Sequence, residues 1–278
     1  MTDVPRQKLA ELFLEAALTS RPHLIVEGPD DERFFRAWAA AVGADFLTVS
    51  SVEDIDIDTD TVLSIGLADG NRGRVVATAK SASDEDVPVI CVADRDCGHH
   101  VEEHSYETLL WTDFPAIESY AVDEATLDRA NDLSLLGKLP KAETLLPPLT
   151  FALREIFAVR TQNEHLQGVK HAAGLPKGSS DLSAFDVSRA IDQRLVGELE
   201  GYPRSEDPDP RTFAYGHDIA DLLLSAFGNA IKNQAGLTHR RALEGALRSA
   251  IQVVGTYRSE PMFTRLEHWV RDQAKRSG

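Results

Sequence analysis

The sequence has few cysteines, and the two that it contains do not form a familiar cysteine-based site. Five residues separate Cys91 from Cys97, so the chain has no C-x-x-C pair. This excludes a disulfide framework and a zinc site built from four cysteines. Redox chemistry therefore has little support.

Long apolar runs are also missing. No stretch approaches the roughly 18 to 20 apolar residues that a membrane-spanning helix needs. The N-terminus lacks the basic and then apolar layout of a signal peptide. We therefore expect no membrane association and a cytoplasmic location. A Walker motif is absent as well, so any ATP dependence has to come from a partner.

Basic residues are scarce, which argues at first against a partner as acidic as nucleic acid. The chain has 29 Lys and Arg against 45 Asp and Glu, a net charge of −16. Nine of these bases and four of the acids fall within residues 228–278, a local balance of +5, which leaves −21 for the rest. This asymmetry suits an acidic metal site with a basic flank, and it suits ordinary solvated helix faces equally well.

What is present is the composition of an ordinary folded protein: 278 residues, 42% hydrophobic and 27% charged. In the first part of the chain, short apolar runs that favour strands alternate with helical patterns. The expected strands are residues 23–26, 45–50, 61–65, 87–93 and 106–111. The expected helices are residues 6–19, 33–38 and 72–81. This alternation predicts an α/β fold with a parallel sheet covered on both faces.

From about residue 114 the patterns are almost wholly helical. The expected helices are residues 125–131, 149–163, 184–201, 218–233, 240–253 and 261–275. Residues 174–180 and 202–210 are rich in Pro, Gly and Ser and are expected to be loops. We therefore expect two regions. Residues 1–135 form an α/β core with an N-terminal helix, and residues 136–278 form a helical region that packs on the core or extends it.

Carboxylates follow two of the expected strands directly. Glu27 comes after residues 24–26, and Asp94 and Asp96 come after residues 89–93. Ligands of open parallel sheets collect at the carboxyl ends of the strands. If the second segment stays extended, Asp94 and Asp96 share a face, because side chains alternate with period two. The three carboxylates are then expected to converge.

Three neighbouring carboxylates repel one another strongly unless a hard cation neutralises them. Mg²⁺ takes one or two carboxylates and completes its shell with waters and phosphate oxygens. Such an ion orients a phosphodiester, polarises its phosphorus and lowers the pKa of a bound water. The sequence therefore predicts a site for Mg²⁺ or Mn²⁺ at Glu27, Asp94 and Asp96.

Four short segments resemble the TOPRIM superfamily of topoisomerases, primases, maturation nucleases and OLD-type nucleases. Residues 26–35 (VEGPDDERFF) resemble its V-E-G-x-x-D-x-x-F opening, and residues 89–96 resemble its hydrophobic strand that ends in D-x-D. Within the superfamily, the bacterial group catalogued as DUF4435 carries an IE-x-Y element and a late G-K-D element. Residues 116–120 (AIESY) are similar to the first. Residues 215–218 (YGHD) are similar to the second, with His217 where Lys is usual.

The resemblance covers residues 22 to 225 approximately and implies a TOPRIM-like Rossmannoid core with nuclease activity. It implies that Glu27 is a metal ligand or a general acid/base and that Asp94 and Asp96 are metal ligands. It adds Glu118 to the catalytic residues as an accessory acid. Proteins of this kind often serve in bacterial anti-phage defence beside an ABC-type or OLD-like ATPase, which makes such an ATPase an expected partner.

Each of these residues also has a plainer interpretation. Glu27 can be a strand-end acid that caps a helix. Asp94 and Asp96 can be solvated acids of a turn, and Glu118 can be a glutamate on a helix surface.

Two accessory positions remain open in the same way. Asp31 is expected either to cap the helix after Glu27 or to support a metal ligand as an outer carboxylate. His217 can bind a phosphate or a metal, or it can be an ordinary histidine.

Two further patterns do not meet the requirements of a metal site. Residues 53–60 mimic a calcium-binding loop, but they lack its Gly and its bidentate Glu, so we expect an acidic edge or loop. Cys97, His99, His100 and His104 do not have the spacing of a known zinc ligand set.

The leading functional prediction is therefore metal-dependent hydrolysis of a phosphodiester in DNA or RNA. One alternative is a catalytically inactive TOPRIM-fold subunit that binds or regulates. Another is a phosphoesterase for small molecules, which the D-x-D pattern also permits. The sequence leaves the choice between DNA and RNA, the sequence preference, the oligomeric state and the identity of the ATPase open.

Overall fold

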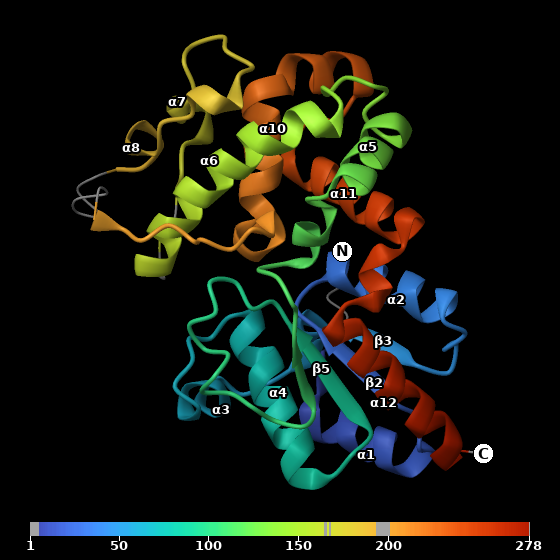
Figure 1. The fold of residues 1–278 in the computed structure, drawn as a ribbon. Helices are drawn as coiled ribbons and strands as arrows, with labels where there is room; N and C mark the ends of the chain where they lie inside the picture. Colours follow the sequence, from blue (N-terminus) through green and yellow to red (C-terminus); the bar gives the residue numbers. More distant parts are fainter. Residues whose placement is uncertain (1–5, 164–165, 167, 193–200, 278) are drawn as a thin grey trace. The chain divides into compact units, whose positions relative to one another are not determined.

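The computed structural model describes residues 6–163, 166, 168–192 and 201–277 (Figure 1). It is an α/β fold with a parallel sheet in the N-terminal half and a mostly helical C-terminal region, so the expected fold class is confirmed at that level. The chain divides into two compact units. Residues 1–94, 100–113 and 258–278 make up the α/β unit, and residues 95–99 and 114–257 make up the helical unit. The expected division between residues 135 and 136 stays a prediction.

Four parallel strands of the described residues form the central sheet, in the order β3-β2-β5-β6. Their bounds are β2 (His23–Val26), β3 (Thr48–Ser51), β5 (Val89–Ala93) and β6 (Leu109–Trp111). Leu24 of β2 pairs with Val49 on one side and with Ile90 on the other. After β2 the chain proceeds toward one edge of the sheet, and after β5 toward the other. The border between β2 and β5 is therefore the topological switch point, where ligands of open α/β sheets bind.

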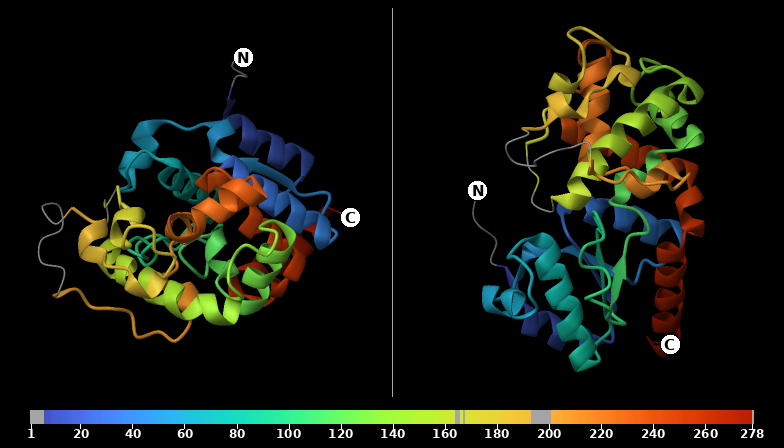
Figure 2. Two further views of the ribbon diagram at one scale, coloured as in Figure 1. Left: turned by 90° about the horizontal axis from the view of Figure 1, so that it is seen from above. Right: turned by 60° about the vertical axis from the view of Figure 1, so that its left-hand side comes forward.

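One face of the sheet packs against α1 (Leu9–Thr19) and α4 (Asn71–Glu85). Strand residues with alternate spacing, Ile25, Cys91 and Ala93, belong to the same buried cluster as Phe13 of α1 and Val76 of α4. β5 is buried along its whole length, which is typical of a strand with helices on both faces. Figure 2 shows α4 and α12 (Pro261–Ser277) on opposite sides of the strands.

The other face carries an aromatic cluster from α2 (Pro29–Ala41) and α12. Phe263 of α12 stacks on Phe35 at 5.8 Å between ring centroids and lies 6.4 Å from the ring of Trp38. The backbone N–H of Met262 donates to Asp113, which follows β6, over 3.1 Å. Because each buried aromatic side chain removes a large apolar area from water, this cluster fixes α12 to the α/β unit.

β1 (Gln7–Lys8) and β4 (Ile55–Asp56) form a second, short parallel pair, and β4 is followed in the chain by α3 (Thr59–Ser64). The prediction of a strand at residues 61–65 is wrong, because α3 occupies most of this range. The side chain of Asp58 accepts from the backbone N–H of Asp60 over 3.3 Å and so starts the helix. The acidic run at residues 53–60 was expected to be an edge or loop. Its middle contributes the edge strand β4, whereas its ends belong to the short helix η1 (Val52–Asp54) and to α3.

The helical unit contains α6 (Ala142–Gln162), α10 (Gly216–Ala230) and α11 (Arg240–Val254) as its long helices. Its shorter elements are η2 (Ile117–Ala121), α5 (Glu124–Leu133), α7 (His171–Gly174), η3 (Leu182–Ala184), α8 (Val187–Ala190), η5 (Pro210–Phe213) and η6 (Ile231–Ala235). The chain leaves the unit within η7 (Thr256–Ser259). α11 packs on α5, η2 and α10. The prediction of a continuous helix at residues 184–201 is wrong in its described part, where only the short helix α8 forms and Phe185, Asp186 and Ile191 have extended backbone. Residues 193–200 of this range lie outside the described residues.

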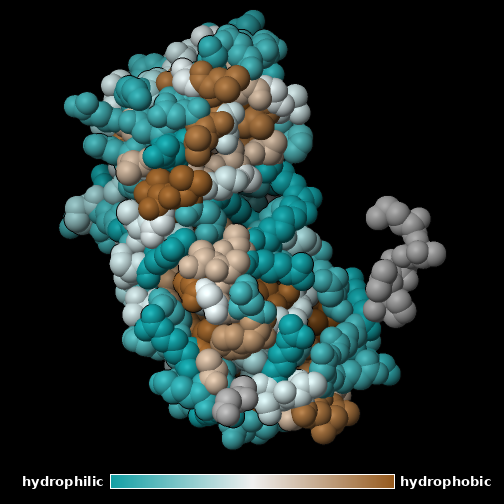
Figure 3. All heavy atoms as spheres, turned by 90° about the vertical axis from the view of Figure 1, so that its right-hand side faces the viewer, coloured by the Kyte–Doolittle hydropathy of each residue, from teal (hydrophilic) through white to brown (hydrophobic). Residues whose placement is uncertain are grey.

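Within the described ranges, no helix combines the length and the apolar character needed to cross a membrane. Hydrophilic side chains cover most of the face shown in Figure 3, and the hydrophobic residues on it form separate patches. A cytoplasmic location stays a prediction.

Candidate functional site

Glu27 and Asp94 meet at the switch point of the sheet. β2 ends at Val26 and β5 ends at Ala93, so the two acids follow neighbouring parallel strands. The backbone N–H of Asp94 donates to Oε1 of Glu27 over 2.8 Å. The expected convergence of these two strand ends is therefore present, and it is held by a hydrogen bond between residues 67 positions apart.

The start of α2 fixes the backbone that follows Glu27. The N–H of Gly28 donates to Oδ2 of Asp31 over 3.1 Å, and Asp31 stands in the first turn of the helix. Such a carboxylate satisfies a backbone donor that the helix leaves without an internal partner, and it is also stabilised by the positive end of the helix dipole. Asp31 thus has the capping role, one of the two that we expected.

Asp96 has a different backbone from the one expected. The strand ends at Ala93, and Asp96 has a left-handed φ of 47°. Its N–H donates to the carbonyl of Pro115 over 3.0 Å, and the N–H of Gly98 donates to the carbonyl of Arg95 over 2.7 Å, as in a tight turn. The period-two argument therefore does not apply at Asp96, which belongs to the helical unit while Asp94 belongs to the α/β unit. The role of Asp96 as a metal ligand stays a prediction.

Glu118 is buried in the helical unit, with 3% of its surface exposed. Nε of Arg248 donates to its Oε1 over 2.6 Å, so an arginine of α11 pairs with this carboxylate. Breaking a buried pair of this kind leaves an uncompensated charge, which is why both partners are needed. The alternative of a glutamate on a helix surface is wrong. Its role as an accessory catalytic acid stays a prediction.

The two short segments around Glu118 and His217 are packed together. A Cβ atom on Gly216 would lie 2.7 Å from Oε2 of Glu118, closer than real Cβ contacts allow. Oγ of Ser119 donates to the carbonyl of Ala214 over 2.6 Å and accepts from the N–H of Ala116 over 3.0 Å. Residues 116–120 and 215–218 thus form one structural element, in which glycine leaves room for the buried carboxylate.

His217 is half exposed and pairs with Glu244 of α11. Its Nδ1 lies 2.8 Å from Oε1 of Glu244, and 53% of its side chain is exposed. The hydrogen bond to Glu244 raises the pKa of His217 above its ordinary value, burial opposes this rise, and the charge of Glu244 adds to it. Glu244 is also 3.5 Å from Nε of Arg240. His217, Glu244 and Arg240 therefore form a network of charged and hydrogen-bonded side chains.

Asp218 follows His217 and is even more deeply buried than Glu118, with 1% of its surface exposed. Nε and Nη2 of Arg160 donate to its two oxygens over 2.7 Å each, and Nε2 of His171 lies 2.8 Å from Oδ1. Burial alone would raise the pKa of Asp218, but the hydrogen bonds from His171 and Arg160 outweigh it, so the pKa is lowered. These partners lie 47 and 58 residues away, and no sequence signal predicts them.

A cavity of about 390 Å³ opens beside this network. Its lining includes Arg160, His171, Asp218, Asp221 and Arg240. Two arginines there face two aspartates, so the lining has no large excess of either charge.

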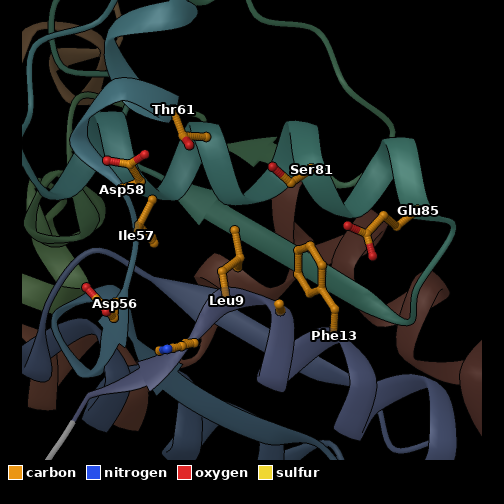
Figure 4. Close-up of a pocket in the computed structure, with 10 residues that line it drawn as sticks. Leu9, Phe13, Asp56, Ile57, Asp58, Thr61, Ser81 and Glu85 are labelled. Atoms are coloured by element: carbon orange, nitrogen blue, oxygen red, sulfur yellow. The ribbon is translucent and has the colours of Figure 1, made fainter.

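The α/β unit has a cavity of about 510 Å³ between α1, the segment after β4, and α4 (Figure 4). Leu9 and Phe13 point toward α4, which contributes Ser81 and Glu85. None of the carboxylates that we expected to bind metal lines it. We assign no chemistry to this cavity.

The basic excess of residues 228–278 is divided between the two units. Residues up to 257 belong to the helical unit, and those from 258 belong to the α/β unit. Several of the bases are paired with acids: Arg240 with Asp221, Arg248 with Glu118, Arg271 with Glu267, and Lys275 with Asp272. The positive charge available to a nucleic acid is accordingly smaller than the sequence count.

Comparison with models of known protein families gives no match to this chain, and comparison with curated proteins gives none either. The resemblance to TOPRIM domains therefore depends on its four short segments alone, and it stays a prediction.

Proposed function

We propose that this chain is a TOPRIM-type nuclease that hydrolyses phosphodiester bonds of DNA or RNA with Mg²⁺ or Mn²⁺. The observation that carries the proposal is the hydrogen bond of 2.8 Å from the Asp94 N–H to Glu27. It holds two carboxylate-bearing residues together at the switch point between β2 and β5. In open α/β sheets, ligands bind at this point, outside the carboxyl ends of the strands.

The donors at this place suit a hard cation. Glu27 and Asp94 are both partly exposed, so a hydrated ion and a phosphate group can reach them. Mg²⁺ prefers such oxygen donors and needs only one or two carboxylates from the protein. When bound, the ion supplies charge stabilisation at phosphorus and acidifies a water molecule.

The residues of the chain have distinct tasks in this proposal. Glu27 binds the ion or moves the proton of the attacking water, and its bond to the Asp94 N–H holds its carboxylate in one orientation. Asp94 is a ligand directly after the neighbouring strand. From the resemblance alone, Asp96 is proposed as a further ligand. Glu118 is an accessory acid whose charge Arg248 compensates.

The test is a cleavage assay with plasmid, single-stranded DNA and tRNA, each with Mg²⁺, with Mn²⁺ and with EDTA. We expect cleavage of at least one substrate that requires the metal. Glu27→Gln and Asp94→Asn keep the size of each side chain and remove its charge, and we expect each to lower the rate at least about 100-fold. Asp45→Asn is the matched control. Asp45 is exposed and precedes β3, so it lies at the amino ends of the parallel strands, whereas Glu27 and Asp94 lie at the carboxyl ends.

Two results would contradict the proposal in different ways. No cleavage of any nucleic acid by the wild type, with an ATPase partner included, would refute the nuclease activity. Metal-dependent cleavage that survives in both Glu27→Gln and Asp94→Asn would show that the site lies elsewhere. Hydrolysis of small phosphate esters without cleavage of nucleic acids would favour a small-molecule phosphoesterase.

The second candidate is a TOPRIM-fold subunit that binds or regulates and does not catalyse. The observation in its favour is that acid–base residues of the helical unit are engaged with one another: Glu118 with Arg248, and His217 with Glu244. Binding of nucleic acid in a gel-shift assay without cleavage would support it. In either case we propose, from the resemblance, a role in bacterial anti-phage defence with an ABC-type or OLD-like ATPase as partner.

A further inference from the structure

Three metal-binding side chains gather in the loop between β5 and β6. His100, Glu103 and His104 each offer one ligand atom, and these atoms all lie within 4.8 Å of one another. The N–H of His104 donates to the carbonyl of His100 over 3.3 Å, which bends the backbone so that residues four apart face the same side. All three residues belong to the α/β unit.

His104 is held in place by its surroundings. Only 5% of its surface is exposed, and the indole N–H of Trp111 on β6 donates to its carbonyl over 3.1 Å. Its Nδ1 lies 3.3 Å from the hydroxyl of Tyr106. A histidine that binds a metal usually has its other ring nitrogen in such a contact, which fixes the orientation of the ring. With Nδ1 engaged, Nε2 is the nitrogen that His104 offers to a metal.

We propose that His100, Glu103 and His104 form a binding site for a borderline divalent cation, with Zn²⁺ as the best fit, separate from the carboxylate site at Glu27 and Asp94. Two imidazoles and one carboxylate are a ligand set that zinc uses with a water in the fourth position. Mg²⁺, which prefers oxygen ligands and octahedral geometry, fits it poorly.

The geometry requires a modest contraction. Zn–N bonds of about 2.0–2.1 Å place tetrahedral ligand atoms about 3.4 Å apart. Glu103, whose side chain is 70% exposed, can supply most of the movement, and its Oε2 already lies 3.6 Å from Nδ1 of His100. The buried His104 stays in place, and the more exposed ligands close on the ion.

The loop has a matched control residue. His99 precedes the group directly, is exposed, and lies with its Nε2 2.8 Å from the carbonyl of Thr161. It is a histidine of the same loop that does not belong to the proposed ligand set.

The experiment measures binding and needs no enzymatic activity. Untagged full-length protein is treated with EDTA, desalted and titrated calorimetrically with Zn²⁺, with and without a large excess of Mg²⁺. Co²⁺ serves as a second probe, because a tetrahedral site gives it strong visible absorption. We expect one Zn²⁺ per chain, no competition by Mg²⁺, and a loss of affinity of at least about 10-fold in His100→Ala and in Glu103→Gln. His99→Ala should bind like the wild type.

His104→Ala is included with a circular dichroism spectrum, because the residue is buried. If this variant is folded, it should lose the site; if it is unfolded, His100→Ala and Glu103→Gln decide the matter. No binding of Zn²⁺ or Co²⁺ by the wild type, or equal affinity in the wild type, His100→Ala and Glu103→Gln, would overturn the proposal. Failure of the nuclease assay leaves these outcomes unaffected, so the two proposals are tested separately.

Discussion

Replacing Gly216 by alanine is the most direct test of the packing between residues 116–120 and 215–218. The added methyl group would meet Oε2 of Glu118 at 2.7 Å and Cβ of Ala116 at 3.1 Å. Glu118 cannot easily retreat, since it is 3% exposed and bonded to Arg248 over 2.6 Å. The methyl group therefore has to move the helix start or break the ion pair.

The expected magnitude combines two opposing effects. Overpacking of a tight interior costs about 1–3 kcal/mol. Alanine is favoured over glycine by about 0.5–1 kcal/mol in the middle of a helix, and Gly216 gains at most this much because it is the first residue of α10. We expect a net loss of about 1–2 kcal/mol in the free energy of unfolding. Gly245→Ala in α11 is the matched control, because a Cβ there meets nothing within 4 Å, so it should be neutral or stabilising.

The assay is urea unfolding followed by circular dichroism and by tryptophan fluorescence. A double-mutant cycle with Glu118→Ala adds a second readout, because removing the carboxylate removes the closest obstacle. Gly216→Ala should therefore cost less in the Glu118→Ala background than in the wild type. Equal stability changes in Gly216→Ala and Gly245→Ala would refute this account of the packing.

Three further predictions concern single contacts. Asp218→Asn should destabilise by about 3–5 kcal/mol in urea unfolding; because the pKa of this carboxyl is lowered, its stabilisation holds above the unfolded pKa and is lost as pH falls through the folded one, so the variant should show a weaker acid dependence. The pKa of His217 should be above its ordinary value in an NMR titration and fall in Glu244→Gln; its stabilising effect is present at low pH and lost as pH rises through the folded pKa. Phe263→Ala should cost about 3–5 kcal/mol, whereas Phe151→Ala, at a position 45% exposed, should cost far less.

The two central strands were predictable because they are short, buried along their whole length and directly followed by polar residues. Residues 23–26 and 89–93 are apolar runs that end at Glu27 and Asp94, and both form strands. Parallel strands place their carboxyl ends at one edge, so the approach of these two acids follows from the sequence once the strands are neighbours. The order of the strands is what the sequence did not specify.

The error at residues 61–65 has a local cause. Thr61, Val62 and Ile65 favour strands, but the run is short and its periodicity does not distinguish the two structures. The cap residue Asp58 was the available signal for a helix. Burial of Val62 against the α/β core is satisfied by either conformation, so the cap decides.

The partners of the buried charges could not be predicted. Arg248 and Glu118 are 130 residues apart, and nothing in either local pattern indicates the pairing. The same holds for His217 and Glu244, at 27 residues. Glu103 was missed for another reason. The sequence analysis considered only Cys97 and the histidines as zinc ligands, whereas the group in the structure consists of His100, Glu103 and His104.

The position of α12 has a consequence for how the protein is made. Its Phe263 completes the aromatic cluster on α2, yet it follows the whole helical unit in the chain. During synthesis, residues 114–257 can therefore begin to pack while the α/β unit still lacks α12 over Phe35 and Trp38. Until α12 has left the ribosome, the aromatic side chains of α2 lack the partner that covers them in the folded protein.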